Sequence, residues 1–387
     1  MDKVLQARWA LAAMFLANGF TMGSFAPQIP LLLPRHDITK STLGLMLLAL
    51  GIGAVVAMLF SGKIIARYGS RATLTTFALA IVPVLPAVVL APSLPVLVLA
   101  MATFGAMVGC MDVAMNAQAV EVERRLGRAI MSSSHGFWSL GGFVGAGLGG
   151  LVIARHGAET HAVAAATLAG IAIVGALRFL MAGPARPMAA APRTRLLPRD
   201  AGLWLLGLIS LMSMAPEGAV LDWAALYIQT ELGANVASSG LAFSMFAGAM
   251  ALMRFMGDGL RNRYGAVRTL RLSALIGSGG LLAAALAPSA PVAILAFGIA
   301  GLGVANMIPV IFSAAGNHPG MASGAAISFV TMAGYSGILL APTSIGFVAE
   351  AVGFRVTFAA LAFVLLLVAI LAARASAAET VHAGQPA

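Results

Sequence analysis

The chain has 387 residues, of which 60% are hydrophobic and 9% are charged, and its formal net charge is +10. Soluble domains carry about 25% charged residues, so the composition excludes an ordinary soluble domain. It predicts an all-α polytopic membrane protein.

Twelve apolar runs are long enough to cross a bilayer, since about 20 helical residues span its hydrocarbon core. The first run is longer than the apolar region of a signal peptide and carries polar residues, so we expect it to be retained. The predicted spans cover residues 8–34, 41–62, 71–91, 94–118, 131–155, 160–182, 201–229, 237–258, 267–287, 290–314, 322–349 and 355–374.

Polar residues recur at helical spacing within two of these spans. In span 8–34 a single stripe follows steps of three and four residues, which places its members on one helix face. Span 94–118 repeats the pattern with two glycines, an acid and an amide. The first stripe comprises Asn18, Thr21, Phe25 and Gln28, and the second comprises Gly105, Gly109, Asp112 and Asn116.

Span 201–229 contains two acids and a proline, Pro216, although it is otherwise apolar. An ionisable side chain in hydrocarbon is costly unless it faces a polar cavity or a partner. Pro216 removes one backbone hydrogen bond and frees a carbonyl beside Glu217. We expect Glu217 to be a substrate or proton site, the alternative being a buried acid bonded to a neighbouring helix. Asp222, about 140° further round the helix, is expected to make a capping or gate contact.

The sequence repeats itself at an offset of 196 residues. The offset aligns Gly44-Leu45 with Gly240-Leu241, Arg67-Tyr68-Gly69 with Arg263-Tyr264-Gly265, Gly105 with Gly301, and Gly141 with Gly337. Because each half holds six spans, both enter the membrane in the same orientation. We therefore predict two bundles, residues 1–182 and 201–387, joined by a Pro- and Arg-rich linker over residues 183–200.

Basic residues orient the predicted spans. Of the 23 Lys and Arg residues, only Arg35, Lys40, Arg155 and Arg355 lie on the side away from the termini. Cytoplasmic loops carry the excess of positive charge, so both termini are expected in the cytoplasm, with the chain in the inner membrane. This bias accounts for the basic charge without nucleic-acid binding.

The stretch Ser61–Arg71, SGKIIARYGSR, resembles the loop G-x-x-x-D-R-x-G-R-R of the major facilitator superfamily. Gly62, Arg67, Gly69 and Arg71 match it, whereas Ala66 replaces the family's Asp. Residues 112–142 and 217–228 further resemble a YbjJ-like branch that includes proteins associated with rhizopine uptake. The resemblance covers nearly the whole chain and implies the fold of that superfamily.

In that superfamily the first, fourth, seventh and tenth spans line the cavity, which implies roles for the polar residues. Asp112 and His135 are at comparable depth and could exchange a proton, the alternative for His135 being a packing role. The expected solute-binding residues are Asn18, Thr21, Phe25, Gln28, Asn116, Trp138, Glu217, Asn306 and Tyr335. The expected proton-coupling residues are Glu217, Asp112 and His135, and the expected gate residues are Arg67, Asp222, Arg254, Asp258 and Arg263.

Two kinds of transport fit these residues. Hydroxyl, amide and aromatic groups suit a polyol, cyclitol or sugar-like solute, which favours uptake by proton symport through alternating access. The alternative is a proton-driven efflux antiporter, whose glycine and proline motif is matched at Gly141, Gly145, Gly149 and Gly150 but has Ala146 in place of the proline. We expect a monomer without cofactor or metal, and not an enzyme.

Overall fold

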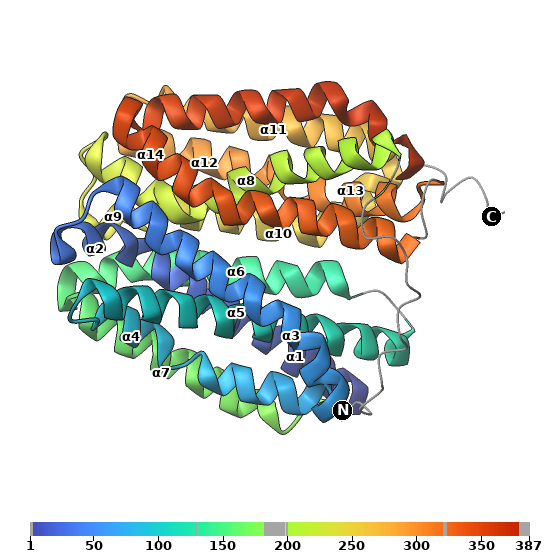
Figure 1. Cartoon of the computed structure of the whole chain (residues 1–387), viewed down its shortest axis with the longest axis horizontal. Helices are drawn as coiled ribbons and strands as arrows, with labels where there is room; N and C mark the ends of the chain where they lie inside the picture. Colours follow the sequence, from blue (N-terminus) through green and yellow to red (C-terminus); the bar gives the residue numbers. More distant parts are fainter. Residues whose placement is uncertain (1–2, 128–129, 182–197, 199, 320–322, 379–387) are drawn as a thin grey trace.

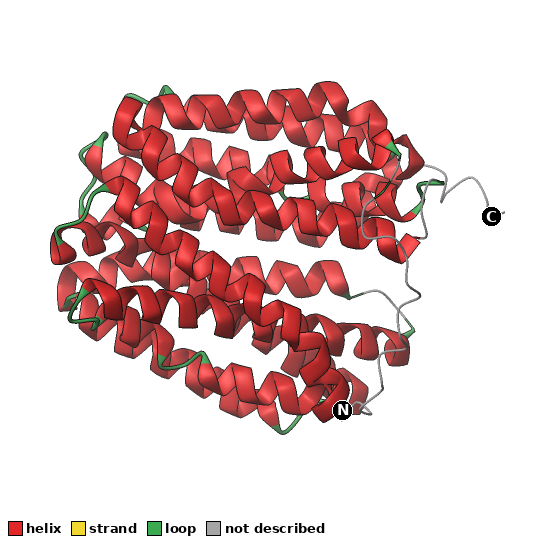
Figure 2. Ribbon diagram, viewed as in Figure 1, coloured by secondary structure: helices red, strands yellow, loops and turns green. Residues whose placement is uncertain are grey.

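The computed structural model describes residues 3–127, 130–181, 198, 200–319 and 323–378. Every regular element in these ranges is a helix (Figure 2). The N-terminal half comprises α1 (Lys3–Phe25), η1 (Ala26–Gln28), α2 (Ile29–His36), α3 (Lys40–Ala80), α4 (Val84–Val89), α5 (Leu94–Leu126), α6 (Met131–His156) and α7 (Ala158–Leu177). The C-terminal half comprises α8 (Ala201–Thr230), α9 (Val236–Ser239), α10 (Leu241–Tyr264), α11 (Ala266–Ala285), α12 (Ala290–Val304), α13 (Met307–Gly316), α14 (Ser323–Leu371) and η2 (Ala372–Ala378).

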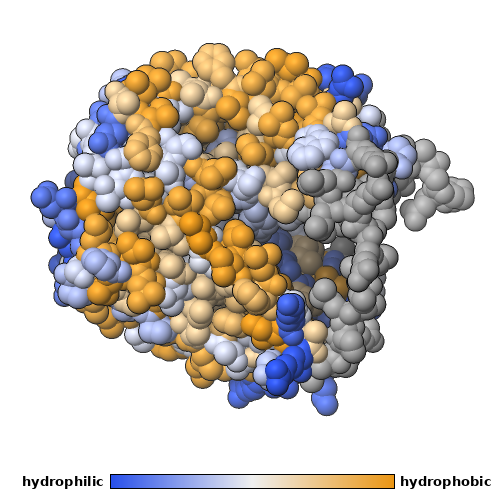
Figure 3. Space-filling view, in the orientation of Figure 1, coloured by the Kyte–Doolittle hydropathy of each residue, from blue (hydrophilic) through white to orange (hydrophobic). Residues whose placement is uncertain are grey.

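Within these ranges, nine helical stretches are long and apolar enough to cross a membrane. The stretch Lys40–Val89 turns back at Gly69, and Phe329–Ala377 turns back at Gly353, so each contributes two spans. Adding α11 accounts for the twelve predicted spans. Apolar side chains cover much of the visible surface, with hydrophilic residues towards its two ends (Figure 3). The all-α fold with twelve spans is therefore confirmed.

The two halves lie side by side, the N-terminal half below and the C-terminal half above in the view of Figure 1. We call the end where α1 begins and α14 finishes the terminal end, and the other the distal end. The expected linker, residues 183–200, lies outside the described residues except for Pro198 and Asp200, so the domain boundary stays a prediction. Asp200 caps α8 by accepting a hydrogen bond from the Gly202 amide at 2.6 Å.

The repeat offset of 196 residues reappears in the backbone geometry. Gly69 and Gly265 share a conformation with φ near +80° (φ 81° and 78°), which L side chains rarely adopt, and each follows an Arg-Tyr pair. Thr39 and Asn235 likewise cap the next helix of their halves through a backbone amide three residues on. Since cap, turn and reversal recur at one spacing, the parallel pseudo-repeat is confirmed.

Helix α6 packs against both halves because glycines occupy two of its faces. A Cβ atom on Gly141 would lie 2.7 Å from the Phe20 backbone nitrogen of α1. On another face, a Cβ atom on Gly150 would lie 2.6 Å from the Ala237 carbonyl oxygen of α9. Close approach of this kind needs residues without side chains. The middle and the last turns of α6 are thereby held close to α1 and α9.

Contacts between α3 and α14 join the two halves at the distal end. The Ser41 backbone amide donates to Oε2 of Glu350 at 2.8 Å, and Lys40 Nζ donates to the Ala349 carbonyl at 3.4 Å. The Thr343 hydroxyl donates to the Gly44 carbonyl at 3.1 Å. These contacts hold the distal end closed.

This closure predicts a dependence on pH. The Ser41 backbone hydrogen bond is the main cause that lowers the pKa of Glu350 from its usual 4.5. The ionised carboxylate therefore favours the closed form at neutral pH. This contribution is lost as the pH falls through the lowered pKa of Glu350. We expect Glu350→Ala at neutral pH, or acidification of the wild type, to increase opening, measured as the distance between spin labels on α2 and α14.

Glu159→Ala is the matched control for this experiment. Glu159 is an exposed carboxylate at the same end, and its ion pair with Arg35 at 3.5 Å lies within the N-terminal half. Its removal should leave the label distance unchanged. Equal opening in both variants would mean that surface charge, and not the Ser41 hydrogen bond, controls closure.

Candidate solute and proton site

A cluster of polar side chains lies where α5, α6, α8, α10 and α14 approach one another. At its centre, Arg254 Nη2 of α10 contacts Oε1 of Glu217 of α8 at 3.3 Å, and the two side chains are only 16% and 20% exposed. Arg254 Nη1 also donates to the Ser139 hydroxyl of α6 at 2.6 Å. An acid from α8, a base from α10 and a hydroxyl from the other half thus form one network.

A second set of hydrogen bonds lies in the N-terminal half, between α5 and α6. The Nε2 atom of His135 lies 3.2 Å from Oδ1 of Asn116, and the Asn116 amide donates to the Asp112 backbone carbonyl at 3.0 Å. Asn116 therefore stands between the predicted pair, Asp112 and His135. His135 is held edge-on against Phe15, with ring centroids 5.2 Å apart.

Tyr335 of α14 lies near an acid of each half. Its hydroxyl is within electrostatic reach of both Asp112 and Glu217, while His135 is within reach of Arg254. One acid from each half thus lies within electrostatic range of the same hydroxyl group. Such convergent polar groups in an otherwise apolar interface are what orient a small polar ligand.

Trp138 and Asn18 extend the cluster towards α1. The Trp138 indole Nε1 donates to Oδ1 of Asn18 at 2.9 Å, and Asn18 is fully buried. In the part of the chain that the structure describes, the Asn18 Nδ2 atom has no hydrogen-bond partner. A buried unpaired donor costs about 1–3 kcal/mol. The Nδ2 atom of Asn18 is therefore a donor whose hydrogen-bonding capacity the described residues leave unused.

Three members of the predicted stripe on α1 and η1 do not join the cluster. Gln28 is buried against α7, where its amide lies 2.7 Å from Nδ1 of His161. Phe25 packs edge-on against Phe104 of α5 at 5.3 Å. The Thr21 hydroxyl donates to the Ala17 carbonyl of its own helix. Phe25 and Gln28 thus contact the inside of the N-terminal half, not the place where the halves meet.

The predicted gate residues are found in different settings. Arg67 and Arg263 are exposed, and each guanidinium group lies over the ring of the following tyrosine. Arg254 and Asp258 are four residues apart, a spacing that places them on one face of α10. Arg254 nevertheless contacts Glu217, and the side chain of Asp258 lies outside the described residues. Asn306, at the break between α12 and α13, is buried, and its Nδ2 atom has no described hydrogen-bond partner.

Asp222 is buried, at 9% exposure, and the described residues offer its carboxylate no hydrogen bond or ion pair. The expected capping contact is thus not present. Because an unpaired buried acid is destabilising, we expect Asp222→Asn to raise the free energy of unfolding by about 1 kcal/mol, measured by thermal denaturation. Transport should stay within about twofold of the wild type. Loss of transport with normal folding would instead place Asp222 in the transport cycle.

Two arginines of this region have more contacts than their sequence positions suggested. Arg254 lies near the end of the predicted span 237–258, and its repeat counterpart is Met58, just as Thr21 is that of Glu217. Arg254 and Glu217 lie on neighbouring spans, and each replaces an uncharged residue of the other half. This shared departure from the repeat was the sequence signal for their contact. Arg8, counted only for orientation, is buried, and its guanidinium group donates to Ser133 at 2.6 Å and lies over Phe137.

Comparison with known proteins identifies the family. The model of the Major Facilitator Superfamily matches residues 11–325 and 203–385. The chain belongs to the major facilitator superfamily. It is 35% identical to an uncharacterized transporter of this superfamily type from Yersinia pestis, over 92% of each chain. It is also 29% identical to the membrane protein MosC of Rhizobium meliloti, over 97% of this chain and 91% of that one.

Solved structures of low sequence identity share the same fold. The nucleoside transporter NupG superposes with a TM-score of 0.74 at 14% identity, over 97% of this chain and 99% of that one. A D-xylose-proton symporter gives 0.73 at 17% identity, over 96% and 97%. This superfamily member is therefore a multi-pass membrane transporter of small solutes, and not an enzyme.

Proposed function

We propose that this transporter takes up a small polar organic solute, such as a polyol, a cyclitol or a sugar-like molecule, in symport with protons. The observation that carries the proposal is the contact of Arg254 with both Glu217 and Ser139, which joins α10, α8 and α6. The fold shared with a nucleoside transporter and a D-xylose-proton symporter supports the solute class.

The Glu217–Arg254 pair gives a physical basis for coupling. When Glu217 is ionised, it neutralises Arg254 and holds α8 against α10 and α6. A proton on the carboxylate removes its charge and the ion pair, leaving Arg254 to bind a solute oxygen or to stay on Ser139. Breaking a buried pair costs about 3–5 kcal/mol, which is enough to shift the balance between two conformations.

The remaining cluster residues supply groups for binding a polyol. Asn18, Asn116 and Tyr335 offer amide and hydroxyl groups, and Trp138 offers an aromatic face on which C–H groups of a ring can stack. Asp112 and His135, joined through Asn116, form a second acid and base near Glu217. We assign Asp112 and His135 to relaying the proton and the others to holding the solute.

We further propose that the transporter acts as a monomer in the inner membrane, with its terminal end in the cytoplasm. The bias of Lys and Arg towards loops at the terminal end supports this orientation. A reporter enzyme inserted at Gly233, between α8 and α9, should be active outside the cell, and one inserted near Pro192 should be active inside. The opposite pattern of activity would reverse the orientation.

The test of function is transport by purified protein in proteoliposomes. With polyols, cyclitols and sugars as candidate solutes, an inward proton gradient should drive accumulation above the external concentration, and a protonophore should abolish it. Efflux antiport predicts the reverse: solute should leave the vesicles as protons enter. Saturable uptake that is indifferent to the proton gradient would refute symport while leaving solute transport intact.

A further inference from the structure

A groove on the outside of the N-terminal half lies near the terminal end, between α3 and α7, away from the polar cluster. Its volume is about 620 Å³. It is lined by Arg71, Ala72, Thr75, Thr76, Val174, Leu177 and Arg178. Two arginines and two threonines thus share a small concave surface with aliphatic side chains. That combination fits a ligand that is anionic at one end and apolar at the other.

Neither arginine is paired with an acid among the residues that the structure describes. Both are exposed. The sequence that follows α7, residues 182–199, contains no Asp or Glu. Arg178 lies over the ring of Phe179 at 4.5 Å, which orients its guanidinium group without removing its charge. The groove therefore keeps two positive charges for a ligand.

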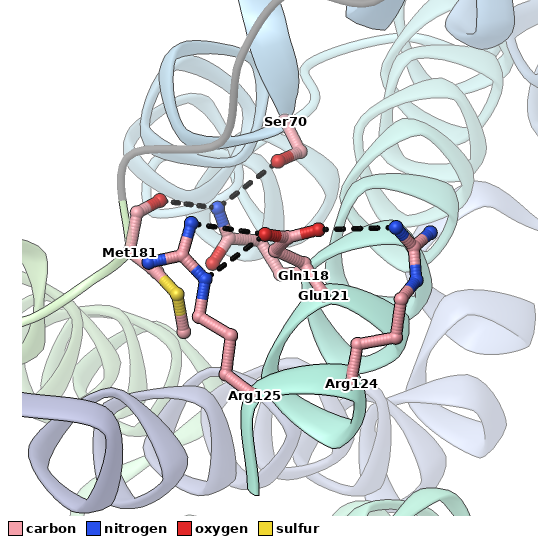
Figure 4. A network of polar contacts seen from close by, with 6 residues as sticks. All are labelled: Ser70, Gln118, Glu121, Arg124, Arg125 and Met181. Carbon is pink, nitrogen blue, oxygen red and sulfur yellow. Dashed lines mark hydrogen bonds and ion pairs between the residues drawn. The ribbon is translucent and has the colours of Figure 1, made fainter. Parts of the chain in front are cut away.

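The spacing of the arginines is fixed by a buried amide from α5. Gln118 Nε2 donates to the Ser70 hydroxyl at 3.1 Å and to the Met181 carbonyl at 2.8 Å (Figure 4). Ser70 precedes Arg71, and Met181 lies three residues beyond Arg178. Nearby, Glu121 is already neutralised by Arg124 and Arg125 at 3.7 and 3.0 Å. One side chain thus holds both walls of the groove, and the adjacent acid is paired elsewhere.

Apolar side chains continue from the groove along the outer face of α7. Val174, Ile171 and Leu168 are 59%, 66% and 59% exposed. They follow one another by three residues and so share one face of the helix. In a membrane-spanning helix this exposed face meets lipid tails. The charged groove and the apolar track are therefore continuous along α7.

From this arrangement we propose that the groove between α3 and α7 binds an anionic phospholipid. The phosphate group lies between Arg71 and Arg178, with the hydroxyls of Thr75 and Thr76 as further donors, and one acyl chain follows Val174, Ile171 and Leu168. Basic pockets between helices at the membrane surface recognise anionic headgroups in this way. Bound lipid would tie the end of α7 to the turn after Gly69.

The proposal is tested by lipid binding to the purified full-length chain in an uncharged detergent. Native mass spectrometry and the thermal midpoint are followed while phosphatidylglycerol, phosphatidylcholine of the same chains, or inorganic phosphate is added. Phosphatidylglycerol should bind and raise the midpoint, less so at high salt. Arg71→Gln and Arg178→Gln should each weaken the affinity for phosphatidylglycerol about fivefold, and the double variant should weaken it roughly thirtyfold.

Arg374→Gln is the matched control, because Arg374 is an exposed arginine at the same end in the other half. It should leave the affinity for phosphatidylglycerol unchanged, and an equal loss in this variant would show that total charge is what matters. An equal effect of phosphatidylcholine would mean that the groove binds acyl chains through its apolar side chains and does not recognise the headgroup. An equal effect of inorganic phosphate would make it a site for a free anion. Any of these three results overturns the proposal.

Discussion

Glu217→Gln should abolish proton-driven accumulation, so that the internal solute concentration never exceeds the external one. Gln keeps the size of Glu and can still bind Arg254, but it cannot release a proton. We expect the variant to insert normally and to bind solute within about tenfold of the wild type, which is the effect of one altered polar contact. Paired measurements of solute binding and of uptake driven by a pH gradient decide this.

The partner arginine supplies the stability control for this experiment. Arg254→Gln leaves Glu217 part-buried without its cation, and we expect a loss of about 3–5 kcal/mol in the free energy of unfolding if the acid stays ionised. The double variant, with Gln at both positions, should recover most of that loss, because no unpaired charge is left. A stability loss in the double variant equal to that in Arg254→Gln would mean that the ion pair itself contributes little.

A retained uphill uptake in Glu217→Gln would contradict the assignment of Glu217. The proton site would then move to Asp112, the acid of the N-terminal half in the same cluster. Asp112→Asn would be expected to lose accumulation in its place. Loss in both variants would place the two acids on one proton path.

Much of the architecture was predictable because repeated backbone features need particular residues. The left-handed turns at Gly69 and Gly265 and the caps at Thr39 and Asn235 stand at the offset found by aligning the sequence with itself. Span lengths follow from the thickness of the bilayer. The linker boundary was predicted from composition alone, and the described residues leave it untested.

The site was predictable only in part, because a helical stripe does not say which neighbour it will meet. Asn18 and Phe25 share a face of α1, yet one contacts α6 and the other contacts α5. Gln28 follows a 3₁₀ turn begun by Ala26 and Pro27, and such a turn advances about 120° per residue and not 100°. The phase of the stripe is therefore lost before Gln28, which is buried against α7.

The contact of Arg254 with Glu217 could not be predicted from spacing along one helix. The interval to Asp258 placed both on one face of α10, but that rule compares residues within a single helix. Packing of α10 against α6 and α8 turns Arg254 towards an acid and a hydroxyl group on other helices. A buried charge is satisfied by its neighbours in space, which a sequence without structure does not show.

Gly280→Ala should destabilise the transporter, whereas the same change at the adjacent Gly279 should not. A Cβ atom on Gly280 would lie 2.7 Å from the Ala300 Cα atom of α12 and 2.9 Å from the Ala296 carbonyl oxygen. Both are backbone atoms, so no side-chain rotation relieves the overlap and α11 must move away from α12. Overpacking of this kind costs typically about 1–3 kcal/mol, which a thermal denaturation curve in detergent resolves.

Gly279 lies one residue away and faces outward, and a Cβ atom there would meet nothing within 4 Å. Alanine at this position loses less backbone entropy on folding than glycine, so Gly279→Ala should be neutral or stabilising by up to about 1 kcal/mol. The two variants have the same composition and differ only in the face of α11 that they change. Opposite shifts in the thermal midpoint are expected because the contact between α11 and α12, and not helix propensity, determines the effect of alanine at Gly280. Equal shifts in the same direction would show that α11 and α12 are not held at the distance described here.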